Sequence, residues 1–79
     1  MARREFAQFE AVSAAVRGEE GYHAAIAVKG LGASGAPRFH KVLAEQTFNT
    51  ALAADEAAEQ SLALLGDVDD EGELVWRAI

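Results

Sequence analysis

The first third of the chain spaces its apolar residues in two ways, which predict a helix followed by a strand. Four apolar residues recur every three or four positions: Phe6, Phe9, Val12 and Val16. This spacing is typical of one face of a helix. Over residues 22–29 the larger apolar side chains instead fall on alternate positions, as in a strand with one buried face. We therefore expect a helix over about 3–17 and a strand over 22–29.

The next apolar segment, residues 38–48, reads as the return strand of a hairpin whose flexible loop is "GLGASGAP". Pairing Val28 opposite Phe39 would keep the larger apolar side chains of both strands on one face. A register shifted by one residue would mix this apolar face with Arg38 and His40. The apolar pattern therefore favours the first register.

The segment "TALAADEAAEQSLALLG" predicts a second helix. Thr50 is its candidate N-cap and Gly66 its candidate C-cap. The expected buried stripe is Ala53, Ala54, Ala57, Ala58, Ser61, Leu64 and Leu65. After an acidic turn, "ELVWRAI" reads as a final strand.

These elements predict a single small α+β domain spanning residues 1–79. The expected order is α-β-β-α-β, with a three-stranded antiparallel sheet of order 2-1-3 packed by the alanine-rich helix. Eighteen of the 79 residues are alanine, so the core holds few large side chains. A domain of this size and composition has a marginal core.

The chain contains no cysteine, which removes disulfides and thiolate chemistry and fits a reducing, cytoplasmic location. The opening "MARREFAQFE" has no apolar run behind its bases, and nowhere do eighteen apolar residues follow one another. We therefore expect neither a signal peptide nor a membrane-spanning segment.

Charge is divided unevenly along the sequence. Residues 1–41 contain six lysines and arginines against four acids, whereas residues 42–76 contain nine acids and neither lysine nor arginine. An anionic surface of this kind repels nucleic acid and membranes and attracts basic partners. We expect the partner to be a basic nucleic-acid-binding protein, and no direct binding of nucleic acid.

The stretch "GDVDDEGELVW" partly matches a calcium-binding loop, because Asp67, Asp69, Glu71 and Gly72 fall at positions one, three, five and six. The match fails at position twelve, where Ala78 stands in place of a glutamate. An exposed acidic turn that leads into a strand fits the pattern better. We expect no metal and no other cofactor.

No arrangement of residues typical of catalysis is visible. The expected register separates His23 from His40 by about 13 Å along the strands, which is too far for one metal or one substrate atom. The serines have no nearby histidine and acid, and "GLGASG" lacks the flanks of a phosphate-binding loop. We therefore expect a protein that is not an enzyme.

The acids of the second half remain as the candidate binding surface, either as a mimic of a nucleic-acid backbone or merely as a solvated face. Three carboxylates within one helical turn span about 6 Å, which is comparable to the phosphate spacing of DNA. Trp76 is expected to be partly buried, and would be an interface anchor if exposed. The predicted partner-binding residues are Asp55, Glu56, Glu59, Asp67, Asp69, Asp70, Glu71, Glu73 and Trp76.

In size, charge and the strand–strand–helix order with "FNT" entering an alanine-rich helix, the chain resembles the small acidic phage and mobile-element proteins of the type I anti-CRISPR kind. The basic first half departs from that pattern. The resemblance implies a non-catalytic inhibitor that occupies a basic nucleic-acid channel, as in blocking DNA binding by a Cascade-type complex. The alternative is a structural or assembly module of a phage or bacterium, as a monomer or a homodimer joined through an open sheet edge or the N-terminal helix.

Overall fold

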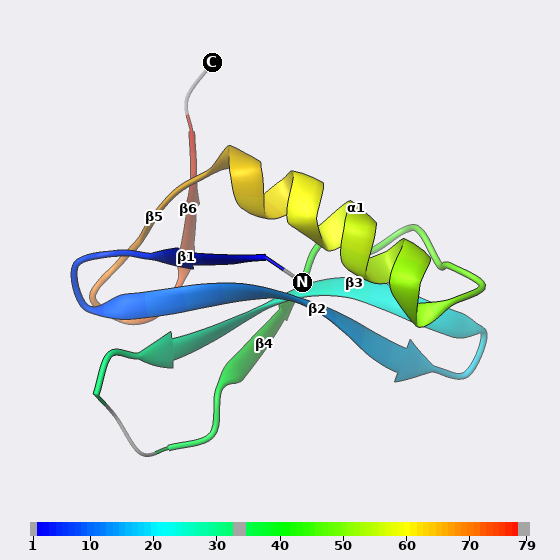
Figure 1. Cartoon of the computed structure of the whole chain (residues 1–79), viewed down its shortest axis with the longest axis horizontal. Helices are drawn as coiled ribbons and strands as arrows, with labels where there is room; N and C mark the ends of the chain where they lie inside the picture. Colours follow the sequence, from blue (N-terminus) through cyan, green and yellow to red (C-terminus); the bar gives the residue numbers. More distant parts are fainter. Residues whose placement is uncertain (1, 33–34, 78–79) are drawn as a thin grey trace.

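The computed structural model describes residues 2–32 and 35–77. The strands and the helix follow in the order β1 (Arg3–Glu5), β2 (Phe9–Gly18), β3 (Gly21–Gly30), β4 (Arg38–Lys41), α1 (Ala51–Leu64), β5 (Leu65–Val68) and β6 (Leu74–Trp76). Strands β1 to β4 form an antiparallel sheet in sequence order, and β5 pairs with β6 in a separate two-stranded sheet (Figure 1). The fold is α+β, but the predicted three-stranded sheet of order 2-1-3 is wrong.

The predicted N-terminal helix is also wrong, because residues 3–17 lie in β1 and β2. Strand β2 pairs along its whole length with β3, from Phe9 opposite Gly30 to Gly18 opposite Gly21. Its alternate residues are apolar or small on both faces, so the two-residue period of a strand is hard to see in the sequence. The long pairing with β3, which no local pattern reveals, decides the conformation.

The hairpin of β3 and β4 has the register that the apolar pattern disfavoured. Val28 lies opposite Arg38, and Ile26 lies opposite His40. Phe39 consequently points to the face that α1 does not cover and is 57% exposed. His40 points to the helix side, where its side chain is only 18% exposed. The shift therefore exposes Phe39 and places His40, which is half-buried, on the helix side.

Helix α1 confirms the second predicted helix and its N-cap. The Thr50 hydroxyl oxygen accepts a hydrogen bond from the backbone N–H of Ala53 at 3.1 Å. The C-cap is Leu65, not Gly66, because the chain turns directly into β5. The buried helix residues are Ala54, Ala58, Ser61 and Leu62, so the predicted stripe is displaced and Leu64 points outward.

The core lies between α1 and the middle of the four-stranded sheet. Small residues on both sides, including Ala11, Ala24 and Ala58, are fully buried and let the helix lie close to the strands. The larger core side chains are those of Ile26, Leu62 and Leu65. The described part of the chain contains no helix that is long and apolar enough to cross a membrane.

The final strand covers Leu74–Trp76, a part of the predicted segment 73–79, whose residues 78–79 lie outside the described part of the chain, and it has a different partner. Strand β6 pairs with β5, with Leu65 opposite Trp76 and Val68 opposite Leu74. A tight turn at residues 69–73 closes this hairpin, so β6 does not reach β3. The resulting C-terminal hairpin extends from the end of α1 past the edge of the larger sheet (Figure 1).

Candidate functional site

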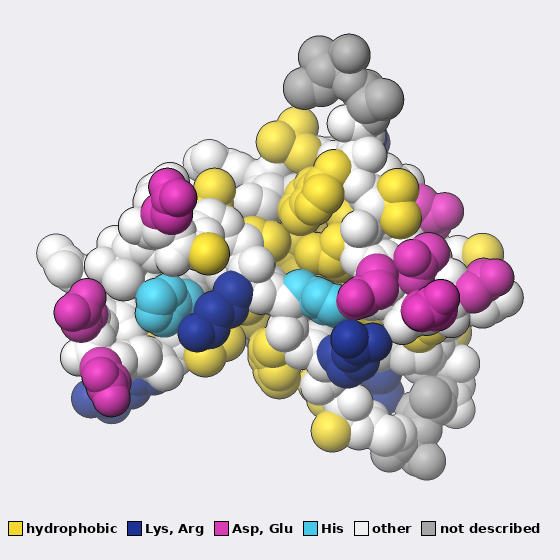
Figure 2. Space-filling model, turned by 180° about the vertical axis from the view of Figure 1, so that it is seen from behind, with side chains coloured by type: hydrophobic (Ala, Val, Ile, Leu, Met, Phe, Trp, Pro, Cys, Tyr) yellow, Lys and Arg dark blue, Asp and Glu magenta, His cyan; other side chains and the backbone are white. Residues whose placement is uncertain are grey.

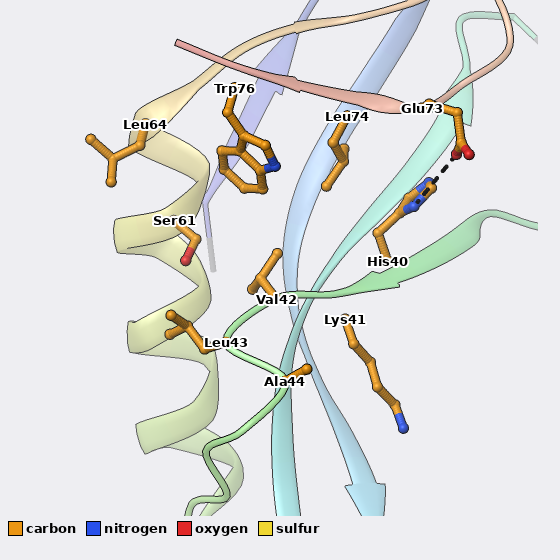
Figure 3. Close-up of a pocket in the computed structure, with 10 residues that line it drawn as sticks. All are labelled: His40, Lys41, Val42, Leu43, Ala44, Ser61, Leu64, Glu73, Leu74 and Trp76. Carbon is orange, nitrogen blue, oxygen red and sulfur yellow. Dashed lines mark ion pairs between the residues drawn. The ribbon is translucent and has the colours of Figure 1, made fainter. Parts of the chain in front are cut away.

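An open groove lies where α1, β4 and the C-terminal hairpin meet (Figure 3). Its volume is about 620 Å³. The lining residues come from three parts of the chain: His40, Lys41, Val42, Leu43, Ala44, Ser61, Leu64, Glu73, Leu74 and Trp76. Apolar side chains form most of the wall, so the groove offers an apolar surface with few polar groups.

Trp76 points from β6 into this groove, between the end of α1 and Leu74 (Figure 3). It is 45% exposed, so the tryptophan is only partly buried and a large part of its side chain faces solvent. Leu64 and Leu43, which line the same groove, are 62% and 41% exposed. Figure 2 shows hydrophobic side chains gathered at the middle of this face. Exposed large side chains around one hollow are typical of an interaction site.

One end of the groove is polar. His40 Nδ1 lies 3.8 Å from a carboxylate oxygen of Glu73. Arg38 reaches the same carboxylate at 3.4 Å and donates a hydrogen bond to the carbonyl oxygen of Glu71 at 3.0 Å. Arg38, from the first half of the chain, thus contacts the acidic turn of the second half. The pairing of β3 with β4 places Arg38 beside that turn.

The acidic turn, which we define as residues 69–73, is held by hydrogen bonds between the Asp69 side chain and backbone N–H groups of the same turn. One carboxylate oxygen of Asp69 accepts hydrogen bonds from the N–H groups of Glu71 and Glu73, both at 2.9 Å. Gly72 adopts φ +81°, a left-handed conformation that suits glycine. Asp69 therefore shapes the turn, whereas Asp70 and Glu71 are exposed at its tip.

The turn is not a helix–loop–helix calcium site, because a strand follows it. Asp67 uses a carboxylate oxygen to accept the N–H of Val68 at 2.8 Å. Across residues 2–32 and 35–77, no group of three or more histidine, aspartate or glutamate side chains is placed to hold a metal ion.

The acids of α1 do not continue the surface of the turn. Figure 1 places the first half of the helix and the β5–β6 turn at opposite ends of the molecule. Glu56 is exposed, Glu59 is half-buried, and Asp55 faces the sheet. The predicted acidic residues are therefore divided between two parts of the surface, and Asp55 is half-buried.

The hydrogen bonds of Asp55 connect the helix to the sheet. Partial burial alone raises the pKa of its carboxyl group, but hydrogen bonds, first among them that of the Ser13 hydroxyl, lower it, so that the net pKa lies below the ordinary value. The buried Ser13 oxygen also accepts the backbone N–H of Ala2 at 2.8 Å. This hydroxyl therefore connects the start of β1 to α1 through β2.

The two histidines lie on opposite faces of the larger sheet. His23 pairs with Val16 and points away from α1, whereas His40 pairs with Ile26 on the helix side. The predicted register would have placed both histidines on one face, whereas the observed register, which is shifted by one residue, does not. Since the histidines are separated by the sheet, they cannot act on one substrate atom.

The structure thus retains one part of the predicted site, the acidic turn with Trp76, and adds the groove. Leu43 and Leu64 were not among the predicted site residues, because their positions depend on β4 and on the end of α1. The sequence offers no signal for Leu64, because its pattern placed this residue in the predicted buried stripe. In comparisons with known proteins, no family model, no curated protein sequence and no solved structure matches this chain.

Proposed function

We propose that this protein is a non-catalytic inhibitor that binds a basic protein through the acidic turn and the adjoining groove, and so occupies that partner's nucleic-acid-binding surface. The observation that carries the proposal is the exposed Trp76 in an apolar groove whose polar end leads to the exposed acids Asp70 and Glu71. Apolar centres with charged margins are typical of protein interfaces.

The charge of the chain supports a basic partner. The net charge is −6, and Figure 2 shows acidic side chains gathered over the β5–β6 turn, beside the hydrophobic group. Such a surface accelerates association with a basic protein by electrostatic steering. Competition with nucleic acid follows, because the same lysines and arginines of the partner would otherwise hold phosphates. An inhibitor of the anti-CRISPR kind would act in this way.

The polar groups of the groove support a binding role over a catalytic one. The closest acid–base pair in the groove is His40 with Glu73, and the Glu73 carboxylate also contacts Arg38. Ser61, across the groove, lies on the buried face of α1. A nucleophile held by its base at hydrogen-bond distance would instead be typical of acyl transfer. The absence of cysteine from the sequence supports a reducing, cytoplasmic site of action.

The test is a displacement assay on a captured partner. A tagged copy of the protein would capture its partner from a host lysate, and the purified partner would then be loaded with fluorescently labelled DNA. We expect the wild type to displace the DNA, and Asp70→Lys with Glu71→Lys to be weaker by about tenfold or more, because charge reversal repels the partner's bases.

The matched control is Glu19→Lys with Glu20→Lys, which reverses two exposed acids in the β2–β3 turn, away from the groove. This control should displace DNA like the wild type. Equal loss in both double variants would show that net charge alone drives binding. A captured partner that binds no nucleic acid would refute the inhibitor.

A second candidate is an assembly module, which one observation favours. Phe39 is exposed on the sheet face that α1 leaves uncovered, beside the apolar residues Val12 and Ala27. If this face joins two copies, light scattering should give a dimer mass, and Phe39→Ser should restore the monomer. A monomer at all accessible concentrations would exclude this candidate.

A further inference from the structure

We infer that the groove receives an apolar side chain of the partner, and that the partner carries its arginines or lysines on the side of the acidic turn. This inference rests on the proposed function and adds the chemistry of the bound segment. The segment of the partner that binds is then a short stretch of protein with an apolar side chain and, beside it, basic residues. A uniform polycation lacks the apolar side chain and is not the expected ligand.

The interior of the groove is suited to an apolar group. Trp76, Leu74 and Val42 point toward its centre, and Ser61 contributes a small side chain from α1 (Figure 3). A volume of about 620 Å³ lies within the range of sites that enclose a small ligand or a large side chain. Burial of an aliphatic or aromatic group there would remove apolar surface from water on both molecules.

The charges around the groove orient the bound segment. At one end Glu73 is shared by Arg38 and His40, and the exposed acids Asp70 and Glu71 follow immediately in the turn. Lys41, which follows His40 in β4, points away from the hairpin (Figure 3). A base on the turn side meets carboxylates, whereas a base on the Lys41 side meets a like charge.

The same charges favour a foreign partner over a second copy of this chain. Two copies that met through their grooves would bring together two acidic turns on molecules that each carry a net charge of −6. Repulsion between like charges at an interface opposes such pairing. A basic segment experiences attraction at the same position.

The only tryptophan of the sequence, Trp76, gives a direct readout, because filling the groove must shift its emission to shorter wavelength. The probes are two peptides of about twelve residues, each with about four arginines on one side of a central pair, which is Leu-Phe in one peptide and Ser-Ser in the other. Neither probe contains tryptophan. We expect the Leu-Phe peptide to shift the emission and to bind about tenfold more tightly than the Ser-Ser peptide.

Two variants separate the groove from the turn. Leu64→Ser changes an exposed groove residue, so the fold is retained, and should reduce the preference for Leu-Phe by about fivefold or more. Asp70→Lys with Glu71→Lys should weaken both peptides equally and reduce the dependence of binding on salt. Leu52→Ser, at an exposed helix position outside the groove, is the matched control and should bind like the wild type.

The outcomes distinguish this inference from the proposed function. Equal binding of both peptides with unchanged Trp76 emission would overturn the groove's role while leaving the acidic turn as a binding surface. If neither peptide binds and the displacement assay also fails, the proposed function falls too. A concentration-dependent dimer that Leu64→Ser dissociates would show that a second copy occupies the groove and would overturn the inference.

Discussion

Arg4 Nη1 lies 2.6 Å from the carbonyl oxygen of Leu65, so a side chain from the first strand caps the end of the helix. The same nitrogen donates to the carbonyl oxygen of Leu62 at 2.9 Å. The guanidinium carbon lies 4.9 Å from the centre of the Phe6 ring. A cation at this position donates to carbonyl oxygens at the end of the helix and interacts favourably with the helix dipole.

Arg4→Met should therefore destabilise the protein while it keeps the aliphatic stem of the side chain. We expect a loss of about 2 kcal/mol in the free energy of unfolding, because two charge-assisted hydrogen bonds disappear. Urea denaturation followed by circular dichroism measures the change. Arg17→Met, an exposed position near the end of β2, is the control for the change in charge. A loss at Arg4 no larger than at Arg17 would contradict the capping role.

Asp55 should contribute to the pH dependence of stability. Its pKa is lowered in the folded protein, so its stabilising effect is present above the pKa of the unfolded state and is lost as the pH falls through the folded pKa. Below the ordinary carboxyl range near pH 4, the stability of the wild type should therefore fall more steeply with decreasing pH than that of Asp55→Asn. Thermal melts across this range measure the difference. Glu56→Gln, which removes an exposed carboxylate from the same helix, is the control for the change in charge.

Gly21 should tolerate no side chain. It adopts φ +137°, and an added Cβ would lie 2.7 Å from the carbonyl oxygen of Phe48. The neighbouring Tyr22 N–H donates to this oxygen at 2.8 Å, so the Phe48 backbone is fixed in place. Gly21→Ala should cost about 2 kcal/mol or more from strain and steric overlap.

The control for this substitution is Gly35→Ala. An added Cβ at Gly35 meets nothing within 4 Å, and its φ is not in the left-handed region. We expect a change of about 0.5 kcal/mol or less. Similar melting temperatures for the two alanine variants would show that Phe48 can move away from the strand.

Leu43 should be replaceable by glycine without loss of stability. It is the non-glycine residue with a left-handed backbone among those described, at φ +53°, and its side chain is 41% exposed. Glycine removes a backbone strain of about 1 to 2 kcal/mol and adds a comparable entropy to the unfolded chain. Leu43→Gly should therefore unfold within about 1 kcal/mol of the wild type. Leu43→Val should be clearly destabilised, because a β-branched residue is poorly suited to this conformation.

The elements that the sequence predicted correctly are those with local signals. The strand at 22–29 has a regular alternation, and α1 has a capping threonine at Thr50 followed by alanines. Residues 9–18 are small or apolar at nearly every position, so their pattern fits a helix face as well as a strand. Pairing with β3 decides between the two, and this contact depends on residues far apart in the sequence.

The candidate site was predicted in part for the same reason. Trp76 and the acidic turn follow one another in the sequence, so they could be associated directly. Asp55 faces the sheet, where it is hydrogen-bonded to Ser13 of β2. His40 lies beside the Glu73 carboxylate, which also contacts Arg38. The groove requires residues from three separate segments, which no periodicity brings together.

The contact between Arg4 and Leu65 has a consequence for how the chain is made. The two residues are separated by 61 positions, so the cap cannot form until Leu65 has been synthesised. Strands β1 to β4 pair in sequence order and can assemble progressively as they leave the ribosome. The apolar side of that sheet then stays exposed until α1 and its cap arrive together. Completion of the core therefore waits for α1 and Leu65, and a chain truncated before α1 would leave its sheet uncovered.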